Sequence, residues 1–372
     1  MRVVIAPDSF KGTIGAAAAA AALADGWRDS RPGDQVTCIP LADGGEGTLE
    51  VLAAAWPGAR WHPARVRGPG TGSADTCWLE LPGQTGVVEL AGTSGLPLLA
   101  TPDPLRAHSA GVGDLVGRAL DAGATAIVIG LGGSACTDGG TGALAALGAR
   151  FLDAAGHELP LGGGALAELA AVDLSGLRPA PPGGVTCLTD VAAPLLGSRG
   201  AAAVFGPQKG ADRRQIAVLE AGLARLAGLL GGAPDAPGAG AAGGAAYGLA
   251  AAWGAVIAAG ATELCRISGL GQAVRGADLV ITGEGRYDVT SADGKVTGAV
   301  IAAAARAGVA AALVAGLIAA TPPDGVRQAV SLAGLAGGAW RAAADPARWL
   351  RAAGRQLALD LAGGTKEPAP RT

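Results

Sequence analysis

The sequence predicts an α/β protein with two α/β domains, one Rossmann-like with a parallel sheet and discontinuous, the other inserted in mid-chain with some antiparallel strands. Three observations support this prediction. The length of 372 residues is enough for two or three domains. Short apolar runs alternate with helical stretches over the first 55 residues, which is typical of a parallel sheet covered by helices. Three strand-like runs between residues 61 and 90 follow without a helix, which indicates antiparallel pairing.

The elements of the first domain are predicted from apolar runs bounded by turn residues and from Ala-rich stretches of helical period. In order they are a strand at 2–6, a helix at 16–27, a strand at 35–39 and a helix at 48–55. The architecture changes near residue 65. We therefore predict a Rossmann-like domain of residues 1–65 and 280–372, and an inserted domain of residues 66–279.

The remaining elements follow from the same patterns. A helix at 111–121 precedes the strongly apolar strand 126–130, and a strand at 185–188 is followed by a helix at 212–230 that ends at two glycines. The chain then predicts a strand at 279–281, a helix at 296–306, a strand at 311–314 and a last helix capped by Asp345.

Composition excludes several classes of protein. Charged residues make up only 16% of the chain and the formal net charge is −3, so neither a disordered chain nor a nucleic-acid-binding surface is expected. The five cysteines are odd in number and never form CxxC, which argues against a disulfide framework or a zinc site and favours a cytoplasmic protein. No signal peptide is predicted, because Asp8 follows the first short apolar run.

One uncharged segment is long enough to be considered as a membrane-spanning helix. Residues 236–262 carry no charge over 27 positions, which is longer than the roughly 20 residues of a spanning helix. The segment is mostly Gly and Ala and lacks the large aliphatic residues that drive insertion. We predict a loop followed by a buried helix, and no membrane partner.

Lysine is rare in this chain, with four lysines against 24 arginines, a bias typical of a GC-rich genome. A lysine kept against that bias is therefore informative. Lys11, Lys209 and Lys295 all lie in Gly-containing, turn-like segments. Asp8 and Ser9 precede Lys11 between a strand and a helix start, a setting that suits an anion, although a plain helix cap and a surface charge explain them equally well.

Two Gly-rich segments also follow strands, where open α/β sheets bind their ligands. In residues 42–48, glycines separate Asp43 from Glu46, so the backbone can approach a ligand while the carboxylates reach a metal ion; capping alone does not explain three glycines. In residues 132–140, a nest of N–H groups for phosphate is expected around Gly132, Gly133 and Ser134, with Asp138 beyond them. A Gly-rich loop alone is weak support, since tight turns also need glycine.

Carboxylates and cations also follow the later strands. Asp190 comes after the strand at 185–188, where a turn or cap is the simpler explanation. Glu284 and Arg286 follow the strand at 279–281, and Lys295 opens the next helix, a combination that suits phosphate plus metal. The chain has no GxxxxGK[ST], no GxSxG and no GxGxxG in a strand–helix context.

Taken in order, these segments resemble the bacterial glycerate kinase family of the first type, the glycerate 2-kinases. The resemblance is carried by 3–12 (VIAPDSFKG within it), 41–48 (LADGGEGT), 130–135 with 138–140, 190–191, 194–197, 199–210, 238–244 and 281–286. It implies ATP-dependent phosphorylation of D-glycerate to 2-phosphoglycerate with Mg²⁺ in a two-domain α/β protein. The chain departs from the family pattern at His108-Ser109, Cys136-Thr137, Ala193 and Val289-Thr290, which affects the choice of hydroxy acid more than phosphoryl transfer.

The roles that follow are hypotheses. Mg²⁺ is expected on Asp43, Glu46 and Glu284; Lys11, Lys295 and Arg286 would neutralise phosphate or carboxylate charge; and Asp190, with Asp138 second, would accept the hydroxyl proton. Substrate or phosphate contacts are expected from Asp8, Ser9, Gly132, Gly133, Ser134, Lys209 and Arg286.

Several alternatives stay open on the sequence alone. They are a kinase for a related hydroxy acid or one giving 3-phosphoglycerate, and a non-catalytic ligand-binding homologue. A nicotinamide-dependent dehydrogenase fits the α/β pattern but lacks the dinucleotide fingerprint. The expected partners are the small molecules ATP and D-glycerate, and the oligomeric state is left open, with a homodimer as one alternative.

Overall fold

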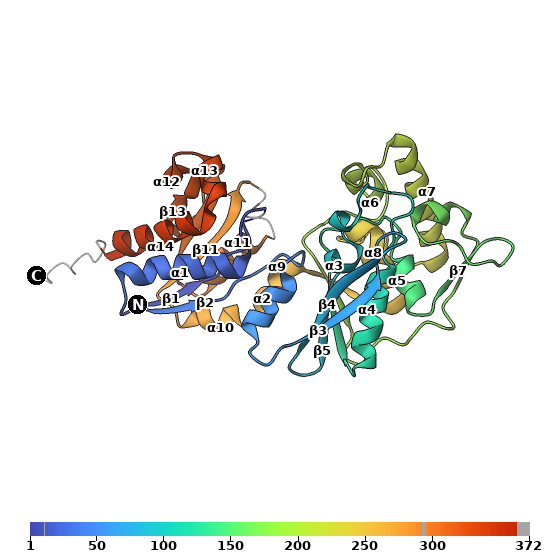
Figure 1. The fold of residues 1–372 in the computed structure, drawn as a ribbon, viewed down its shortest axis with the longest axis horizontal. Coiled ribbons are helices and arrows are strands. Elements are labelled where there is room, and N and C mark those ends of the chain that lie inside the picture. Colours follow the sequence, from blue (N-terminus) through green and yellow to red (C-terminus); the bar gives the residue numbers. More distant parts are fainter. Residues whose placement is uncertain (11, 290, 292–294, 363–372) are drawn as a thin grey trace, which may run out of the picture. The chain divides into compact units, whose positions relative to one another are not determined.

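The computed structural model describes residues 1–10, 12–289, 291 and 295–362. The chain divides into two compact units (Figure 1). The terminal unit consists of residues 1–42 together with the chain from 264 onward, and the central unit consists of residues 43–263. Each unit is built around its own sheet, so the predicted α/β class with an inserted second unit is confirmed.

The sheet of the terminal unit is parallel throughout and has the strand order β13-β12-β11-β1-β2. Strands from the two ends of the chain are neighbours in it, because β1 pairs with β11. This confirms the discontinuous Rossmann-like sheet. The strands are β1 (Arg2–Ile5), β2 (Gln35–Cys38), β11 (Leu279–Tyr287), β12 (Ala310–Ile318) and β13 (Val326–Ser331).

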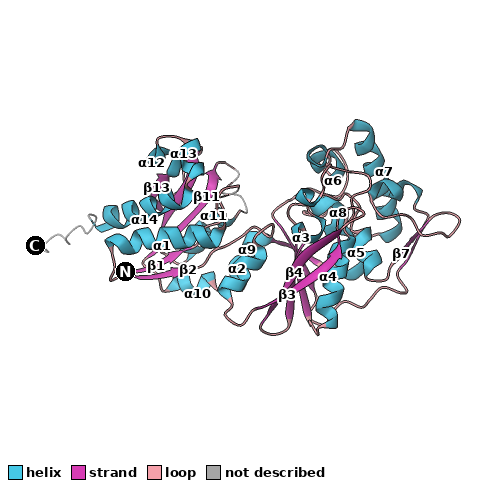
Figure 2. Ribbon diagram, viewed as in Figure 1, coloured by secondary structure: helices cyan, strands magenta, loops and turns pink. Residues whose placement is uncertain are grey.

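Helices flank this sheet (Figure 2), and the most extensive helix packing joins the first helix of the chain to the last. Glycines let these two helices approach closely: a Cβ on Gly26 would lie 1.9 Å from the carbonyl oxygen of Arg351, and one on Gly354 would lie 2.2 Å from that of Leu23. The helices are α1 (Ala16–Ser30), α10 (Leu270–Arg275), α11 (Val296–Arg306), α12 (Leu332–Ala336), α13 (Ala339–Ala344) and α14 (Pro346–Ala362).

The close crossing of α1 and α14 leads to a prediction about stability. Gly354→Val forces the two helices apart, and we expect it to lower the free energy of unfolding by about 1–3 kcal/mol, as over-packing of a core does. Urea denaturation measures the change. The control is Gly271→Ala in α10, where a Cβ meets nothing within 4 Å. Equal unfolding midpoints for the two variants would show that α1 and α14 can move apart without loss of stability.

The sheet of the central unit is mixed, with the order β10-β9-β6-β5-β4-β3. The pairs among β3, β4 and β5 are antiparallel and the others are parallel, which confirms the predicted change of architecture. A small second sheet pairs β7 with β8. The strands are β3 (Arg60–Arg67), β4 (Ser73–Leu81), β5 (Thr85–Glu89), β6 (Ala126–Gly130), β7 (Arg150–Leu152), β8 (Ala171–Asp173), β9 (Val185–Thr189) and β10 (Val256–Ala259).

The helices of the central unit include the predicted amphipathic one. The helix α7 (Arg213–Leu230) begins at Asp212, whose side chain and that of Gln215 form a reciprocal capping box. The uncharged segment holds α8 (Ala241–Trp253), which is interrupted by left-handed backbone at residues 242–244. It then forms β10, a strand that the sequence did not predict. The other helices are α2 (Thr48–Ala55), α3 (Ala91–Ser94), α4 (Ala110–Asp121), α5 (Thr141–Ala146) and α6 (Ala201–Phe205).

The chain passes from the terminal unit into the central unit between residues 42 and 43, and returns between residues 263 and 264. The sequence predicted both boundaries later in the chain, between residues 65 and 66 and between residues 279 and 280. The helix α2 belongs to the central unit because it packs against β4 and β5. The helix α9 (Gly260–Ile267) spans the observed boundary between residues 263 and 264. Across the described residues, the structure contains no helix with the length and apolar character needed to span a bilayer.

Candidate functional site

A loop of the central unit, residues 43–47, lies across the carboxyl ends of β6 and β9. Gly44 has a left-handed φ of +89°, and a Cβ there would lie 2.8 Å from the Leu188 Cβ. A Cβ on Gly130, at the end of β6, would lie 2.7 Å from the carbonyl oxygen of Gly44. Only glycine fits such approaches. The glycines of this loop therefore serve close packing onto the sheet edge.

The second Gly-rich segment lies directly beside this loop. A Cβ on Gly132 would lie 2.4 Å from the Cα of Gly45, so the two backbones are in contact. Gly133 has a φ of +70°, and Ser134 forms an isolated bridge with Gly95. The structure thus brings together the two segments that the sequence predicted as a metal loop and a phosphate loop.

Two aspartates of the central unit contact the start of α9, Asp190 through its carboxylate and Asp43 through its backbone. The Asp190 Oδ1 accepts a hydrogen bond from the Ala261 N–H at 3.2 Å. The backbone of Asp43 packs against the preceding residue, because a Cβ on Gly260 would lie 2.0 Å from the Asp43 carbonyl oxygen. The Asp43 Oδ1 accepts from the Gly45 N–H at 2.9 Å, and Glu46 is exposed. Asp43, Glu46 and Asp190 thus all belong to segments at the carboxyl ends of β6 and β9.

Asp138 lies in the interior instead. It is fully buried, and its Oδ2 accepts hydrogen bonds from the N–H and the hydroxyl of Ser109, both at 2.8 Å, and from the Gly142 N–H. Its Oδ1 accepts from the Gly140 N–H at 3.1 Å. This carboxylate caps the start of α5 and connects it to α4.

The buried network around Asp138 makes a second stability prediction. Asp138→Asn replaces an acceptor by an amide donor opposite N–H groups, and we expect it to lower the free energy of unfolding by about 2–3 kcal/mol. The control is Asp75→Asn, since the side chain of Asp75 is 80% exposed. Denaturant unfolding of both variants measures the difference. Wild-type stability in Asp138→Asn would contradict the structural role.

Lys209 is also enclosed. Its side chain is 1% exposed, and its Nζ donates a hydrogen bond to the carbonyl oxygen of Cys136 at 2.5 Å. Burial lowers the pKa of this ammonium group. Lys209 therefore braces the segment that precedes Asp138 from within the unit.

A second group of predicted residues lies in the terminal unit, just beyond the end of β1 and on the second half of β11. The Asp8 N–H donates to the Gly283 carbonyl oxygen at 2.8 Å, and the Ser9 N–H donates to the Asp8 Oδ1 at 2.6 Å. Glu284 is 8% exposed, and its burial raises the pKa of its carboxyl group, against the opposing effect of the Thr297 side chain. These side chains share one end of the parallel sheet.

The cations of this unit lie on β11 and at the next helix. The sequence predicted a loop after residue 281, but β11 continues to Tyr287 because β12 pairs with it along that length. Arg286 therefore stands on a strand, where it forms an ion pair with Asp288 at 3.6 Å. Lys295 is the N-cap residue of α11, as predicted. Lys11 lies outside the described residues.

Sequence reasoning did not single out Glu89, the last residue of β5. Its Oε1 accepts a hydrogen bond from the Leu49 N–H at 2.8 Å. Burial raises the pKa of Glu89 to about 7. The available signal was an acid inside the otherwise apolar run 87–90, a pattern that by itself predicts only a strand.

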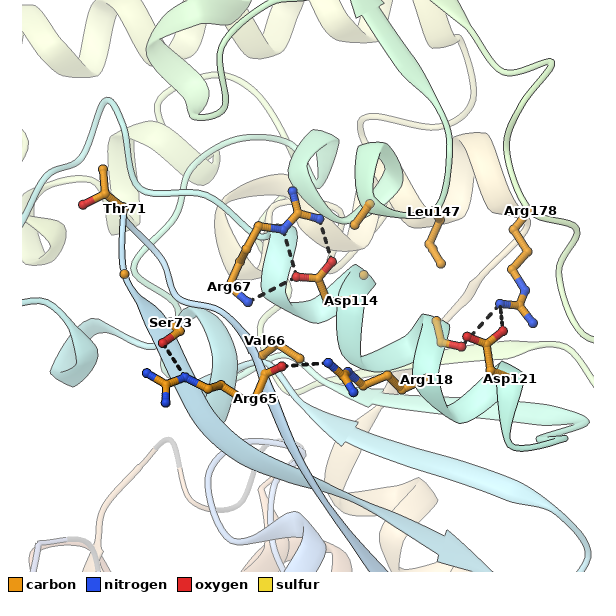
Figure 3. A pocket seen from close by; sticks show the side chains of 14 residues that line it. Arg65, Val66, Arg67, Thr71, Ser73, Asp114, Arg118, Asp121, Leu147 and Arg178 are labelled. Carbon is orange, nitrogen blue, oxygen red and sulfur yellow. Dashed lines mark hydrogen bonds and ion pairs between the residues drawn. The ribbon is translucent and has the colours of Figure 1, made fainter.

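A separate groove of about 980 Å³ lies over α4 (Figure 3). Its walls carry Arg65, Arg67, Arg118 and Arg178, yet each of these guanidinium groups donates to a protein acceptor. The acceptors are Ser73 for Arg65, Asp114 for Arg67, the Arg65 carbonyl for Arg118 and Asp121 for Arg178. Each guanidinium group therefore has a hydrogen-bond acceptor within the protein, and no predicted site residue lines the groove.

The chain is similar to known proteins over almost its whole length. The model of the glycerate kinase family matches residues 3–362. Glycerate 2-kinase of Escherichia coli (strain K12) is 42% identical over 305 residues, 80% of each chain. Glycerate kinase of Bacillus subtilis (strain 168) is 41% identical over 307 residues, 79% of each chain. A crystal structure of a protein assigned as glycerate kinase 2 from Salmonella typhimurium LT2 has a TM-score of 0.86 at 36% identity, covering 98% of this chain and 99% of that one.

Proposed function

This chain belongs to the glycerate kinase family and is thus a small-molecule kinase, and we propose that it transfers the terminal phosphoryl group of ATP to the 2-hydroxyl of D-glycerate, giving 2-phosphoglycerate. The observation that carries the proposal is the backbone contact between Gly45 and Gly132. It brings a carboxylate-bearing loop against a Gly-rich loop at the carboxyl ends of the parallel strands β6 and β9, a position where α/β proteins bind phosphate ligands.

The phosphates are assigned to the Gly-rich segment. Gly132, Gly133 and Ser134 offer backbone N–H groups and a hydroxyl without bulky side chains at the glycines, which suits close approach of phosphate oxygens. Lys209 and Asp138 brace the following residues from inside the unit. They are enclosed, so we assign them to support of this segment rather than to contact with substrate.

The residues present fit a magnesium ion whose coordination shell is completed by phosphate oxygens. Mg²⁺ takes oxygen ligands and is usually held by one or two carboxylates plus phosphates and waters. Asp43 and Glu46 lie three residues apart on one loop, one half-buried and the other exposed. In the part of the chain that the structure describes, no group of three or more His, Cys, Asp or Glu side chains is placed to hold a metal ion. When bound, Mg²⁺ supplies charge neutralisation at the phosphates.

Asp190 is the proposed general base. As the hydroxyl oxygen of D-glycerate bonds to the γ-phosphorus, the bond to the β-phosphate oxygen breaks, ADP leaves, and the hydroxyl proton passes to the Asp190 carboxylate. The Ala261 N–H orients this carboxylate through Oδ1. Asp138, the other candidate, has both oxygens in hydrogen bonds within the protein interior.

The terminal unit contributes the proposed cations. Arg286 and Lys295 would neutralise phosphate or carboxylate charge, together with Lys11, and Asp8 and Ser9 are proposed substrate or phosphate contacts. Glu284, a buried carboxylate on β11, is a further proposed magnesium ligand because Mg²⁺ prefers oxygen ligands. All five cysteines are free, and free cysteines are typical of a reducing compartment, so a cytoplasmic location is part of the proposal.

ADP release from Mg-ATP tests the substrate assignment. The purified protein is assayed with D-glycerate, L-glycerate, glycolate and D-lactate under identical conditions. We expect the highest kcat/KM for D-glycerate. A higher value for another acid would replace the substrate, and no acceptor-dependent ADP release would favour a non-catalytic ligand-binding protein.

A further inference from the structure

The helix α2 begins without a cap of its own. Its N-cap residue is Gly47, which has a left-handed φ of +92° and no side chain to accept a hydrogen bond from the first turn. Helix starts leave backbone N–H groups without partners inside the helix. Glu89, which is 40 residues farther along the chain, reaches this turn from β5, and its Oε1 accepts from the Leu49 N–H at 2.8 Å. A carboxylate from another element thus replaces the local cap.

Glu89 and the loop 43–47 meet the same residue of the sheet. Glu89 pairs with Gly130 in the parallel register of β5 and β6. A Cβ on Gly130 would lie 3.7 Å from the Glu89 Cγ and 2.7 Å from the Gly44 carbonyl oxygen. The loop is therefore held at its start by contact with Gly130 and Leu188, and at its end by the carboxylate that binds the first turn of α2.

A carboxylate costs free energy at this position. Burial raises the pKa of Glu89 to about 7, and the charges of Glu50 and Glu46 raise it further, while the N–H groups of Leu49 and Thr48 oppose the shift. An apolar residue would fill the strand end without this cost. The hydrogen bonds to the start of α2 are what Glu89 adds that an apolar residue cannot.

We propose that Glu89 is a positioning residue for phosphoryl transfer, which caps α2 and thereby holds loop 43–47, with Asp43 and Glu46, against the ends of β6 and β9. The inference rests on the proposed function of that loop. Glu89 acts through backbone N–H groups of α2 and needs no contact with the substrates.

Two variants and a control test this role by kinetics. Glu89→Ala removes the cap, and we expect kcat to fall by about tenfold or more, because small displacements of catalytic groups carry large penalties. Glu89→Gln keeps an acceptor oxygen, and we expect it to restore kcat to within about threefold of wild type. Glu50→Ala, at an exposed position in the first turn of α2, is expected to stay within about twofold. Wild-type kinetics in Glu89→Ala would overturn the proposal.

Amide hydrogen exchange provides a readout that needs no substrate. Glu89→Ala is expected to speed exchange over residues 44–49, relative to the buried strand residues 127–129 of the same unit, and Glu89→Gln is expected to leave it near wild type. Unchanged exchange over 44–49 in Glu89→Ala would overturn the capping role. An inactive wild-type protein with accelerated exchange in Glu89→Ala would instead remove the proposed function and leave the cap standing.

Discussion

Asp190→Asn is expected to lower kcat by about 10²–10⁴-fold, the range that general acid–base catalysis supplies, with little change in stability. Asparagine has the shape of aspartate, and its Oδ1 can still accept the hydrogen bond from the Ala261 N–H. Its amide cannot take up the hydroxyl proton of the substrate. The loss should therefore appear in turnover rather than in folding.

Steady-state kinetics with Mg-ATP and D-glycerate, together with thermal unfolding, measures this separation. Asp235→Asn is a matched control, since Asp235 is an exposed aspartate of the same unit. It should behave as wild type in both measurements. An Asp190→Asn variant that keeps most of its turnover would remove Asp190 from the role of base.

Gly132→Ala is expected to lower kcat/KM by about 10²-fold, because a misplacement of roughly 1 Å in a catalytic loop can have that effect. The new Cβ would lie 2.4 Å from the Cα of Gly45, so one backbone must shift. The shift would separate the carboxylate-bearing loop from the Gly-rich loop, which is the contact on which the proposed site depends.

The control for this substitution is Gly117→Ala on α4, where a Cβ meets nothing within 4 Å. Alanine in a helix is favoured over glycine by up to about 1 kcal/mol, so this variant should be as stable as wild type or more stable, with unchanged kinetics. Wild-type kcat/KM in Gly132→Ala would show that the two loops can separate without consequence for the reaction.

The buried parallel strands were predictable because both of their faces pack into a core. Residues 3–5 of β1 and 127–129 of β6 are continuously apolar, as strands covered on both faces are. The strand β10 was missed because it is a short, partly exposed edge strand within a Gly- and Ala-rich segment. The end of β11 was misjudged because its glycines and charged residues suggest a turn, whereas pairing with β12 extends the strand.

The candidate site was predictable in its segments but not in its contacts. Glycines in the segment 43–47 indicated a close approach, but a sequence does not reveal that Gly130, Gly132 and Gly260 provide the other side of it. Asp138 had the same appearance as an exposed strand-end acid, and only its hydrogen bonds distinguish it as a buried cap. Glu89 was missed because its partner, the Leu49 N–H, belongs to a helix far away in sequence.

The product of the reaction with D-glycerate and Mg-ATP tests the central claim most directly. Enolase added to the reaction acts on 2-phosphoglycerate and reports its formation. We predict an enolase signal that matches the ADP released, mole for mole. ADP release with D-glycerate but without that signal would contradict phosphorylation at the 2-hydroxyl, and no ADP release would contradict the kinase assignment itself.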